Sequence, residues 1–305
     1  MKRLRNLFAG AAALVALSLS ASACDSSPFA ARVNSQTIKQ TALNVELRQW
    51  SSSREYVNAF NQSNSSTGVT VAGQAPGTFS SKWVAGVLGG MIDASIFRQQ
   101  MNATGKTPSP GIEAAANSVN AISQIGWDQF SADFRQTLVA RLADESTLTP
   151  QTVPAATLKT VYDQYARYFF YEICTAQSSA FNQADAMALQ ASGVPNGHTA
   201  CYDQDAFTAQ PPSFQDAVLG LAVGKTAPPI PTVFGYLVVR VVSRTEQGFS
   251  PDVQQVLSTA VLAAQGNPNP TLDGLVAKAN VKVNPTYGSW TSAQVVPPSA
   301  PSTGT

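Results

Sequence analysis

The chain has 305 residues, with 19 Lys plus Arg against 18 Asp plus Glu, and its formal net charge at pH 7 is +1. Nucleic-acid-binding proteins show basic stripes or patches, so this balance predicts no nucleic-acid partner. Charged residues make up only 12% of the chain, which indicates a surface of neutral polar groups and identifies no ligand. The length allows one large domain or two modest ones.

The N-terminus has the composition of an export signal. Residues 1–5 are rich in basic side chains, and residues 7–19 form an apolar stretch that is too short for a membrane span. Small residues at 21–23 then precede Cys24. We therefore expect a signal peptide over residues 1–23.

The position of Cys24 resembles a bacterial lipoprotein signal, in which the cysteine becomes the acylated N-terminus. The alternative is an ordinary secretory signal that is cleaved near Ala23. An acyl chain contributes about 0.8 kcal/mol per buried CH₂, so several chains would hold the protein at a membrane surface. We expect an exported chain anchored to the outer face of the cytoplasmic membrane by lipid on Cys24, with residues 24–31 as a tether.

Two cysteines besides Cys24, namely Cys174 and Cys201, lie 201 − 174 = 27 residues apart. Disulfides persist in exported proteins, and closing a loop of this length stabilises the fold by about 3–4 kcal/mol through chain entropy. A metal site and a reactive thiol are the alternatives. Metal is disfavoured because His198 is the only histidine and no C-x-x-C motif occurs. We predict a structural disulfide and no cofactor.

The first part of the chain, residues 32–160, is expected to be mainly helical. A strand, a turn and a second strand are predicted at residues 32–38, and an amphipathic helix follows Lys39. Residues 63–78 are polar and glycine-rich, which indicates a surface loop. Apolar spacing then predicts a helix over residues 82–101.

The same helical pattern continues towards residue 154. Gly86, Gly89 and Gly90 each cost about 1 kcal/mol in a helix interior, so we expect close packing of a neighbouring helix against them. A weaker helix is predicted over residues 111–122, and prolines mark a hinge at residues 147–154. Between them runs a stripe at helical spacing, which predicts a core-facing helix: Trp127, Phe130, Phe134, Leu138 and Leu142.

The next part alternates between strand and helix patterns. A β-rich run at residues 167–175 predicts a strand, and good helix formers predict a helix over residues 181–191. A further helix contains Phe214, with Gly224 as its C-cap. The β-branched and aromatic run 236–242 predicts a closing strand.

The C-terminal part begins with a helix whose cap is Ser250 and whose first turn contains Pro251. A second helix is expected from Thr271, and the alternating residues 280–288 predict a strand that ends in a turn. Residues 291–305 are rich in Pro and Ser and are expected to form a disordered tail.

Four stretches of the chain, taken in order, resemble the SurA/PrsA-type foldases. The first is Val-Asn-x-x-x-Ile at residues 33–38, followed at once by a helix. Phe-Gln-Asp-Ala-Val at 214–218 and Pro-Ile-Pro-Thr-Val-Phe-Gly-Tyr at 229–236 resemble the last third of a parvulin, the peptidyl-prolyl isomerase module of these proteins. Val-x-Val-x-Pro-x-Tyr-Gly at 281–288 resembles the C-terminal return to their helical domain.

The resemblance implies an α+β fold with two units. A mainly helical SurA N-terminal-like chaperone domain would be formed by both ends of the chain, residues 32–160 and 246–290. A small antiparallel-sheet, degenerate parvulin-like domain would be inserted at residues 165–245. The strand at 280–288 is expected to pair with residues 32–38.

Parvulins use two histidines, a Cys or Asp, a Thr or Ser, and an apolar wall. In this sequence residues 171–173 and Leu237 stand where the histidines would be, so we expect no catalytic residue. Of the parvulin pattern, the apolar-wall position at Phe214 and the loop hydroxyl of Thr232 remain. The resemblance therefore implies peptide contacts at Phe214, Thr232, Phe234 and Tyr236.

Other candidate catalytic groups have simpler interpretations. His198 lies in a turn-rich region and is expected to be a solvated loop residue. Asp203 and Asp205 are expected to be turn and capping groups rather than a general acid–base pair. One histidine also gives little support to a Ser–His–Asp triad.

The expected function is that of a cell-envelope lipoprotein chaperone or foldase. Its partners would be unfolded or extended exported polypeptides and, through the lipid, the membrane. We expect the parvulin module to lack strong isomerase activity. An active peptidyl-prolyl cis-trans isomerase and a non-catalytic structural or assembly lipoprotein are the alternatives. A solute-binding lipoprotein is disfavoured because two balanced α/β lobes are not visible.

Overall fold

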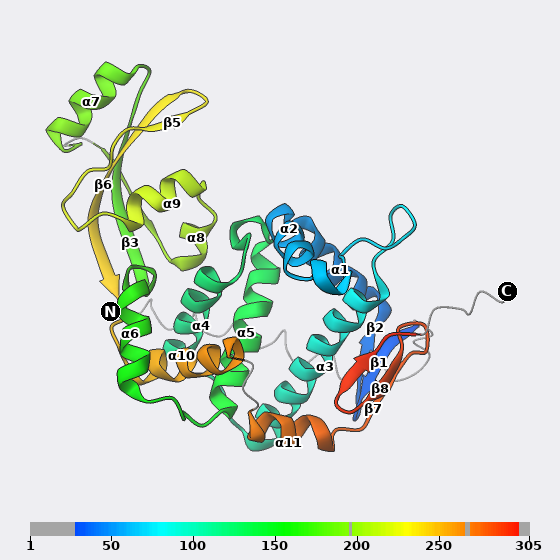
Figure 1. Ribbon diagram of the computed structural model, residues 1–305. Helices are drawn as coiled ribbons and strands as arrows, with labels where there is room; N and C mark the ends of the chain where they lie inside the picture. The colour runs from blue at the N-terminus through cyan, green and yellow to red at the C-terminus, as the bar shows by residue number, and fades with distance from the viewer. Residues whose placement is uncertain (1–27, 195–196, 266–268, 299–305) are drawn as a thin grey trace, which may run out of the picture.

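The computed structural model describes residues 28–194, 197–265 and 269–298. Over these residues the fold is α+β, as predicted, with many helices and with antiparallel sheets of three, four and two strands. Figure 1 shows a mainly helical body with a small sheet module standing to one side of it. Cys24 and the predicted signal peptide lie outside the described residues.

Strands from the two ends of the chain form one sheet. A tight turn joins β1 (Phe29–Val33) to β2 (Gln36–Lys39), and β7 (Val281–Val283) pairs with β1 in the antiparallel sense. Asn34 in the turn donates its backbone N–H to the carbonyl of Asn280 at 2.7 Å. The N–H of Asn280 donates back to Asn34 Oδ1 at 2.9 Å. The predicted return of the C-terminal segment to the N-terminal strands is confirmed.

Helices from before and after the sheet module make up the body. Those before it are α1 (Gln40–Ser52), α2 (Arg54–Ser63), α3 (Ser81–Thr104), α4 (Pro110–Ser123), α5 (Ala132–Leu148) and α6 (Ala155–Tyr165). Those after it are α10 (Pro251–Ala264) and α11 (Pro270–Lys278). Single 3-10 turns lie at Ser65–Thr67, Trp127–Gln129 and Ala166–Tyr168. The predicted cap of α10 is confirmed, because Ser250 Oγ accepts from the N–H of Val253 at 3.3 Å.

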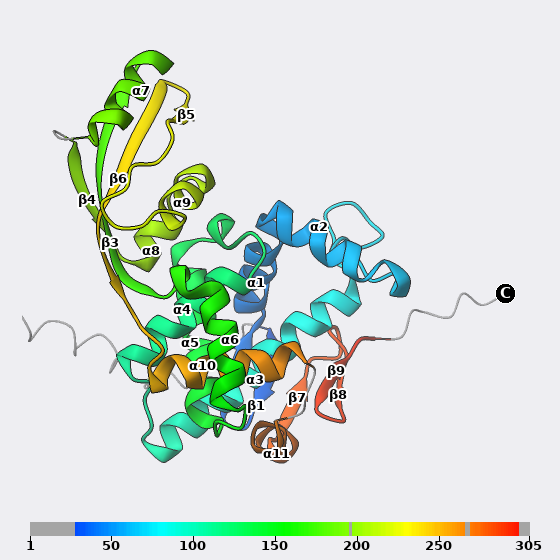
Figure 2. The same cartoon turned by 60° about the vertical axis from the view of Figure 1, so that its left-hand side comes forward.

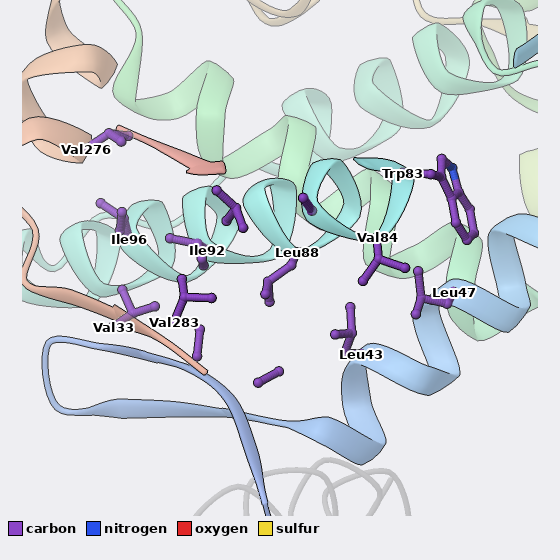
Figure 3. Close-up of a cluster of buried hydrophobic side chains, with 14 of the residues drawn as sticks. Val33, Leu43, Leu47, Trp83, Val84, Leu88, Ile92, Ile96, Val276 and Val283 are labelled. Atoms are coloured by element: carbon purple, nitrogen blue, oxygen red, sulfur yellow. The ribbon is translucent and has the colours of Figure 1, made fainter. Parts of the chain in front are cut away.

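The core of the body lies between the terminal sheet and α3 (Figure 3). Val33 from β1 and Val283 from β7 are both buried there. They meet Leu88 and Ile92 on one face of α3 and Leu43 of α1. Residues about 250 positions apart in sequence therefore share one apolar cluster, which holds the two ends of the chain together.

A second apolar cluster lies where α10 packs against α4, α5 and α6 (Figure 2). Val256 of α10, Ala115 of α4 and Leu158 of α6 are fully buried in it. This packing places a helix from after the sheet module among helices that precede it. The helical body is consequently built from both halves of the chain.

The sheet module consists of four strands and three helices in the described residues. Its strand order is β4 (His198–Tyr202), β3 (Phe170–Ala180), β6 (Gly235–Glu246) and β5 (Ile230–Thr232), all antiparallel. The helices are α7 (Gln183–Ser192), α8 (Gln204–Thr208) and α9 (Pro212–Leu219). The predicted disulfide is confirmed: Cys174 and Cys201 are direct partners on β3 and β4 and are bonded.

A buried polar network attaches the sheet module to the body. Ser118 Oγ of α4 donates to Gln204 Oε1 of α8 at 3.0 Å, and Gln247 Nε2 donates to Ser118 Oγ at 3.2 Å. Gln247 Nε2 also donates to the carbonyl of Phe170 at 3.0 Å, and Gln204 Nε2 to that of Tyr168 at 2.9 Å. Buried hydrogen bonds of this kind fix the orientation of the module on the body, because breaking one leaves a buried polar group with neither a protein partner nor water.

Two predicted elements of the sheet module differ from the structure. The first strand begins at Phe170 and runs to Ala180, because residues 166–168 form a 3-10 turn. The helix that contains Phe214 ends at Leu219, and its C-cap is Gly220 rather than Gly224. Gly220 comes four residues before Gly224, so the first of the two glycines ends the helix.

Two predictions for the body are also corrected. The aromatic stripe from Trp127 to Leu142 is not one helix, because Phe130 ends a 3-10 turn in an extended conformation and α5 begins at Ala132. Its rings still share a cluster. The C-terminal tail does not begin at residue 291, since β8 (Ser289–Thr291) and β9 (Gln294–Val296) form a hairpin. Val295 of this hairpin is buried in the body core.

Among the described residues no helix combines the length and apolar composition that a membrane crossing requires.

The joining of the two chain ends generates a stability prediction. Val283→Ala should lower the free energy of unfolding by about 1–3 kcal/mol, because it removes buried methyl groups from the shared core. The neighbouring Lys282 is exposed, so Lys282→Ala should change it by less than about 0.5 kcal/mol. Urea unfolding followed by circular dichroism measures both. Equal effects of the two substitutions would contradict this assignment of the core.

Candidate functional site

The structure separates the four residues for which peptide contacts were predicted. Phe214 is only 3% exposed. It packs in the core of the sheet module, with ring centroids 5.7 Å from Tyr202 and 6.0 Å from Phe207. It supports the strands from behind and presents almost no surface to a peptide.

Thr232, Phe234 and Tyr236 lie together on the β5–β6 hairpin. Thr232 Oγ1 donates to the carbonyl of Gly235 at 3.2 Å and accepts from the N–H of Phe234 at 3.3 Å. This hydroxyl therefore shapes the turn. Tyr236 is half-buried against Val238, whereas the Phe234 ring is 86% exposed.

The turn of this hairpin and the turn before α7 together form an apolar tip. We define the tip as Phe181, Val233 and Phe234, which are 92%, 91% and 86% exposed. Gly235 has a φ of 126°, and a Cβ there would lie 3.0 Å from Phe181 Cα, so the two turns are in contact. Figure 1 shows both turns at the end of the sheet farthest from the body. Phe181 was not among the predicted contact residues, because a helix was expected to begin there, whereas α7 begins at Gln183.

The positions that would carry the parvulin histidines are not brought together. Ile173 faces Arg244 on β6, whereas Leu237 faces Ser179. Arg244 lies seven positions after Leu237 on β6, and at about 3.3 Å per residue these positions are more than about 20 Å apart along the sheet. The sheet thus offers no pair of polar groups at them.

Other polar groups of the sheet module have structural roles. Asp203 Oδ1 accepts from the N–H of Ala206 at 2.8 Å and caps α8, which confirms its predicted role. Asp205 Oδ1 accepts from Asn117 Nδ2 of α4 at 3.1 Å and adds to the attachment of the module. His198 is exposed, but it begins β4 rather than lying in a loop.

A hollow with a volume of about 1130 Å³ lies in the body. Its walls come from α3, α5, α11 and the β8–β9 hairpin. Phe97, Leu272 and Trp290 provide apolar surface, and three carboxyl groups line the same space: Asp93 of α3, Glu145 of α5 and Asp273 of α11. This grouping could not be predicted from the sequence, since the three acids lie on separate elements.

Burial and electrostatic repulsion raise the pKa values of Asp93 and Glu145. Loss of hydration, with the nearby Asp273 carboxylate, raises the pKa of Asp93 to about 6. Loss of hydration, with the nearby Asp93 carboxylate, raises the pKa of Glu145 to about 7. Arg141 also lines the hollow, but its guanidinium holds both oxygens of Glu46 at 2.6 Å.

A pH dependence follows from these two carboxyl groups. Unfolded Asp and Glu titrate near 4, so between about pH 4 and pH 7 the folded chain holds protons that the unfolded chain has released. The free energy of unfolding should therefore fall as pH rises through this window, by about 1.4 kcal/mol for each unit by which a pKa is raised, which amounts to several kcal/mol for the two groups together. Urea midpoints measured between pH 5 and pH 8 test this.

The double variant Asp93→Asn, Glu145→Gln should reduce the slope of the free energy of unfolding against pH, and it should stabilise the fold most at pH 8. Glu55→Gln, an exposed substitution on α2, is the matched control and should leave the slope unchanged. A double variant that keeps the wild-type slope would show that other groups cause it.

No protein-family model matches the chain, and no curated protein matches it. Several solved structures do match the chain. One of two structurally related SurA-like chaperones of Campylobacter jejuni is 12% identical, with coverage of 84% of this chain and 99% of that one and a TM-score of 0.24. The foldase protein PrsA of Streptococcus pneumoniae is 13% identical, with coverage of 80% and 89% and a TM-score of 0.27.

PrsA of Bacillus subtilis is also 13% identical, with coverage of 83% of this chain and 91% of that one and a TM-score of 0.21. These neighbours are SurA-like chaperones and PrsA foldases, the proteins that the sequence resembles.

Proposed function

We propose that this protein is an exported chaperone of the foldase type, which holds unfolded or extended segments of exported polypeptides. The observation that carries the proposal is the hollow of about 1130 Å³ in the helical body. Small-molecule sites usually enclose about 300–1,000 Å³, so this hollow is large enough for several residues of an extended chain. The sequence resemblance to SurA/PrsA-type foldases supports the same function.

The apolar tip is a second contact surface in this proposal. Phe181, Val233 and Phe234 are large side chains with almost all of their surface in water. Grouped apolar exposure of this kind marks interaction sites. Thr232 and Tyr236 hold the hairpin that presents Phe234, and Phe214 supports it from the core.

Export and anchoring are part of the proposal. The Cys174–Cys201 disulfide supports an oxidising compartment outside the cytoplasm. The lipid on Cys24 rests on the sequence signal alone, since that residue lies outside the described part of the chain. A lipid there would keep the chaperone close to polypeptides as they leave the membrane.

We expect binding without strong isomerase activity. The amide rotation barrier is about 18–20 kcal/mol, and lowering it needs polar groups placed around the twisted bond. The sheet offers Ile173 and Leu237 at the histidine positions, far apart on β3 and β6, and the Thr232 hydroxyl is engaged in its own turn. These contacts support a chaperone whose sheet module does not catalyse isomerisation.

One refolding assay separates the candidate functions. Residues 25–305 are mixed with a denatured protein whose slow refolding phase is limited by X-Pro isomerisation, at a concentration where it aggregates. We expect a higher refolded yield and an unchanged rate of the slow phase. A faster slow phase would identify an active isomerase, and an unchanged yield would favour the structural or assembly role.

Variants of the protein test whether the apolar tip contributes to the higher refolded yield. The double variant Val233→Ser, Phe234→Ser should lower the gain in yield about two- to fivefold, because it removes two exposed apolar contacts worth a fraction of a kcal/mol each. Val223→Ser is the control, because Val223 is an exposed apolar residue of the same module outside the tip. Equal losses in the two variants would exclude a specific role for the tip.

A further inference from the structure

Glycines of α3 form the floor of two adjoining hollows. A Cβ built at Gly86, Gly89 or Gly90 would meet no other heavy atom within 4 Å. The expected close packing of a helix against these glycines is therefore wrong. Gly86 and Gly90, one helical turn apart, line a hollow of about 240 Å³, and Gly90 also lines the hollow of about 1130 Å³. We call the two together the α3 trough.

One end of the trough is aromatic. Trp50, Tyr56, Phe60 and Trp83 line the smaller hollow. The rings of Trp50 and Tyr56 are 4.7 Å apart, and Trp83 Nε1 donates to the Tyr56 hydroxyl at 3.4 Å. These contacts fix the rings as a preformed apolar pocket, which suits an apolar or aromatic side chain.

The other end of the trough is acidic. Asp93, Glu145 and Asp273 approach it from α3, α5 and α11, and the β8–β9 hairpin adds only uncharged lining residues. Within the described residues none of these carboxyl groups has a cation within 4 Å. Arg141, the cation that lines both hollows, is paired with Glu46.

The charged neighbours of this end do not neutralise it. Asp144, beside Glu145 on α5, is paired with Arg98 of α3 at 2.8 Å. Both arginines that reach this region are thus engaged with acids other than Asp93, Glu145 and Asp273. Burial, and after it the repulsion between the carboxylates, raises the pKa values of Asp93 and Glu145. A cationic side chain from outside would complement the remaining charge and offset this repulsion.

The length of α3 sets the spacing between the two ends. Gly86 lies at the aromatic end and Ala94 at the acidic end, and eight residues of helix span about 12 Å. An extended peptide rises about 3.3 Å per residue. Side chains about four positions apart in an extended client would therefore reach both ends.

We propose that the α3 trough binds an extended client segment that places an apolar or aromatic side chain in the aromatic pocket and a Lys or Arg side chain, about four residues away, at the acidic end. This inference rests on the proposed chaperone function and specifies its substrate class. Glycines in the floor let the peptide backbone pass close to α3, because no side chain projects from it there.

The test uses a fluorescein-labelled nonapeptide of Ser, Thr and Gly with one Phe and one Lys four positions apart. Fluorescence anisotropy at pH 8 reports its binding to residues 25–305. Replacing the Lys of the peptide by Gln, or its Phe by Ser, should weaken binding about tenfold or more. A Gln peptide that binds as tightly as the Lys peptide would overturn the proposed selectivity.

A matched pair of glycine variants locates the binding site. Gly90→Leu fills the trough floor, whereas Gly89→Leu adds the same side chain on the same helix at a position that lines neither hollow. Leucine is the better helix former, so both variants should keep their melting temperature. Gly90→Leu should lose peptide binding at least tenfold and Gly89→Leu should not. Wild-type binding by folded Gly90→Leu would overturn the proposal.

A charge variant gives an independent answer that does not depend on the folding of Gly90→Leu. Glu145→Gln with Asp273→Asn should abolish the preference for the Lys peptide over the Gln peptide, and retained preference would overturn the proposal.

The refolding assay on the same proteins separates the proposed binding site from the proposed chaperone function. If the protein raises the refolded yield of the client and Gly90→Leu raises it equally, the proposed binding in the trough is refuted but the chaperone function is not. If the peptide binds in the trough but the refolded yield does not rise, the chaperone function is refuted but the binding site is not.

Discussion

The pairing of β1 with β7 is the constraint on which the rest of the body depends. It joins residues 31–33 to residues 281–283. Two hydrogen bonds between Asn34 and Asn280, one to a backbone carbonyl and one to the Asn34 side chain, close the end of this pairing. Because β7 is fixed there, α11 before it and the β8–β9 hairpin after it lie against α3. These are the elements that wall the large hollow, so its shape depends on contacts between the two ends of the chain.

The sheet module is fixed by a different kind of contact. Ser118, Gln204 and Gln247 form a buried polar network between it and the body, and such networks give directional attachment where apolar packing alone would not. The Cys174–Cys201 disulfide links β3 to β4. The module can therefore present its apolar tip at the far end of a rigid sheet (Figure 1).

Much of the fold could be predicted from sequence because its signals are local. The Ser250 cap, the cysteine pair and the alternating residues around Val283 each identify an element or a bond directly. Distant packing leaves no such signal: Phe214 is buried by Tyr202 and Phe207, and the β8–β9 hairpin forms in a Pro- and Ser-rich stretch because Val295 finds an apolar cluster. The α3 trough was unpredictable for the same reason, since its acids and aromatic rings come from separate helices.

In the proposed mode of binding, unfolded clients lie in the trough along α3. Site-specific photo-crosslinking tests it most directly, with a photoreactive residue at Ser292, an exposed position on the rim of the large hollow, and with exposed Val223 of the sheet module as the comparison site. The structure predicts that an unfolded exported protein crosslinks strongly at Ser292, that excess Phe/Lys peptide suppresses this crosslink, and that the folded client does not react. Equal crosslinking at Ser292 and Val223, unaffected by the peptide, would contradict it.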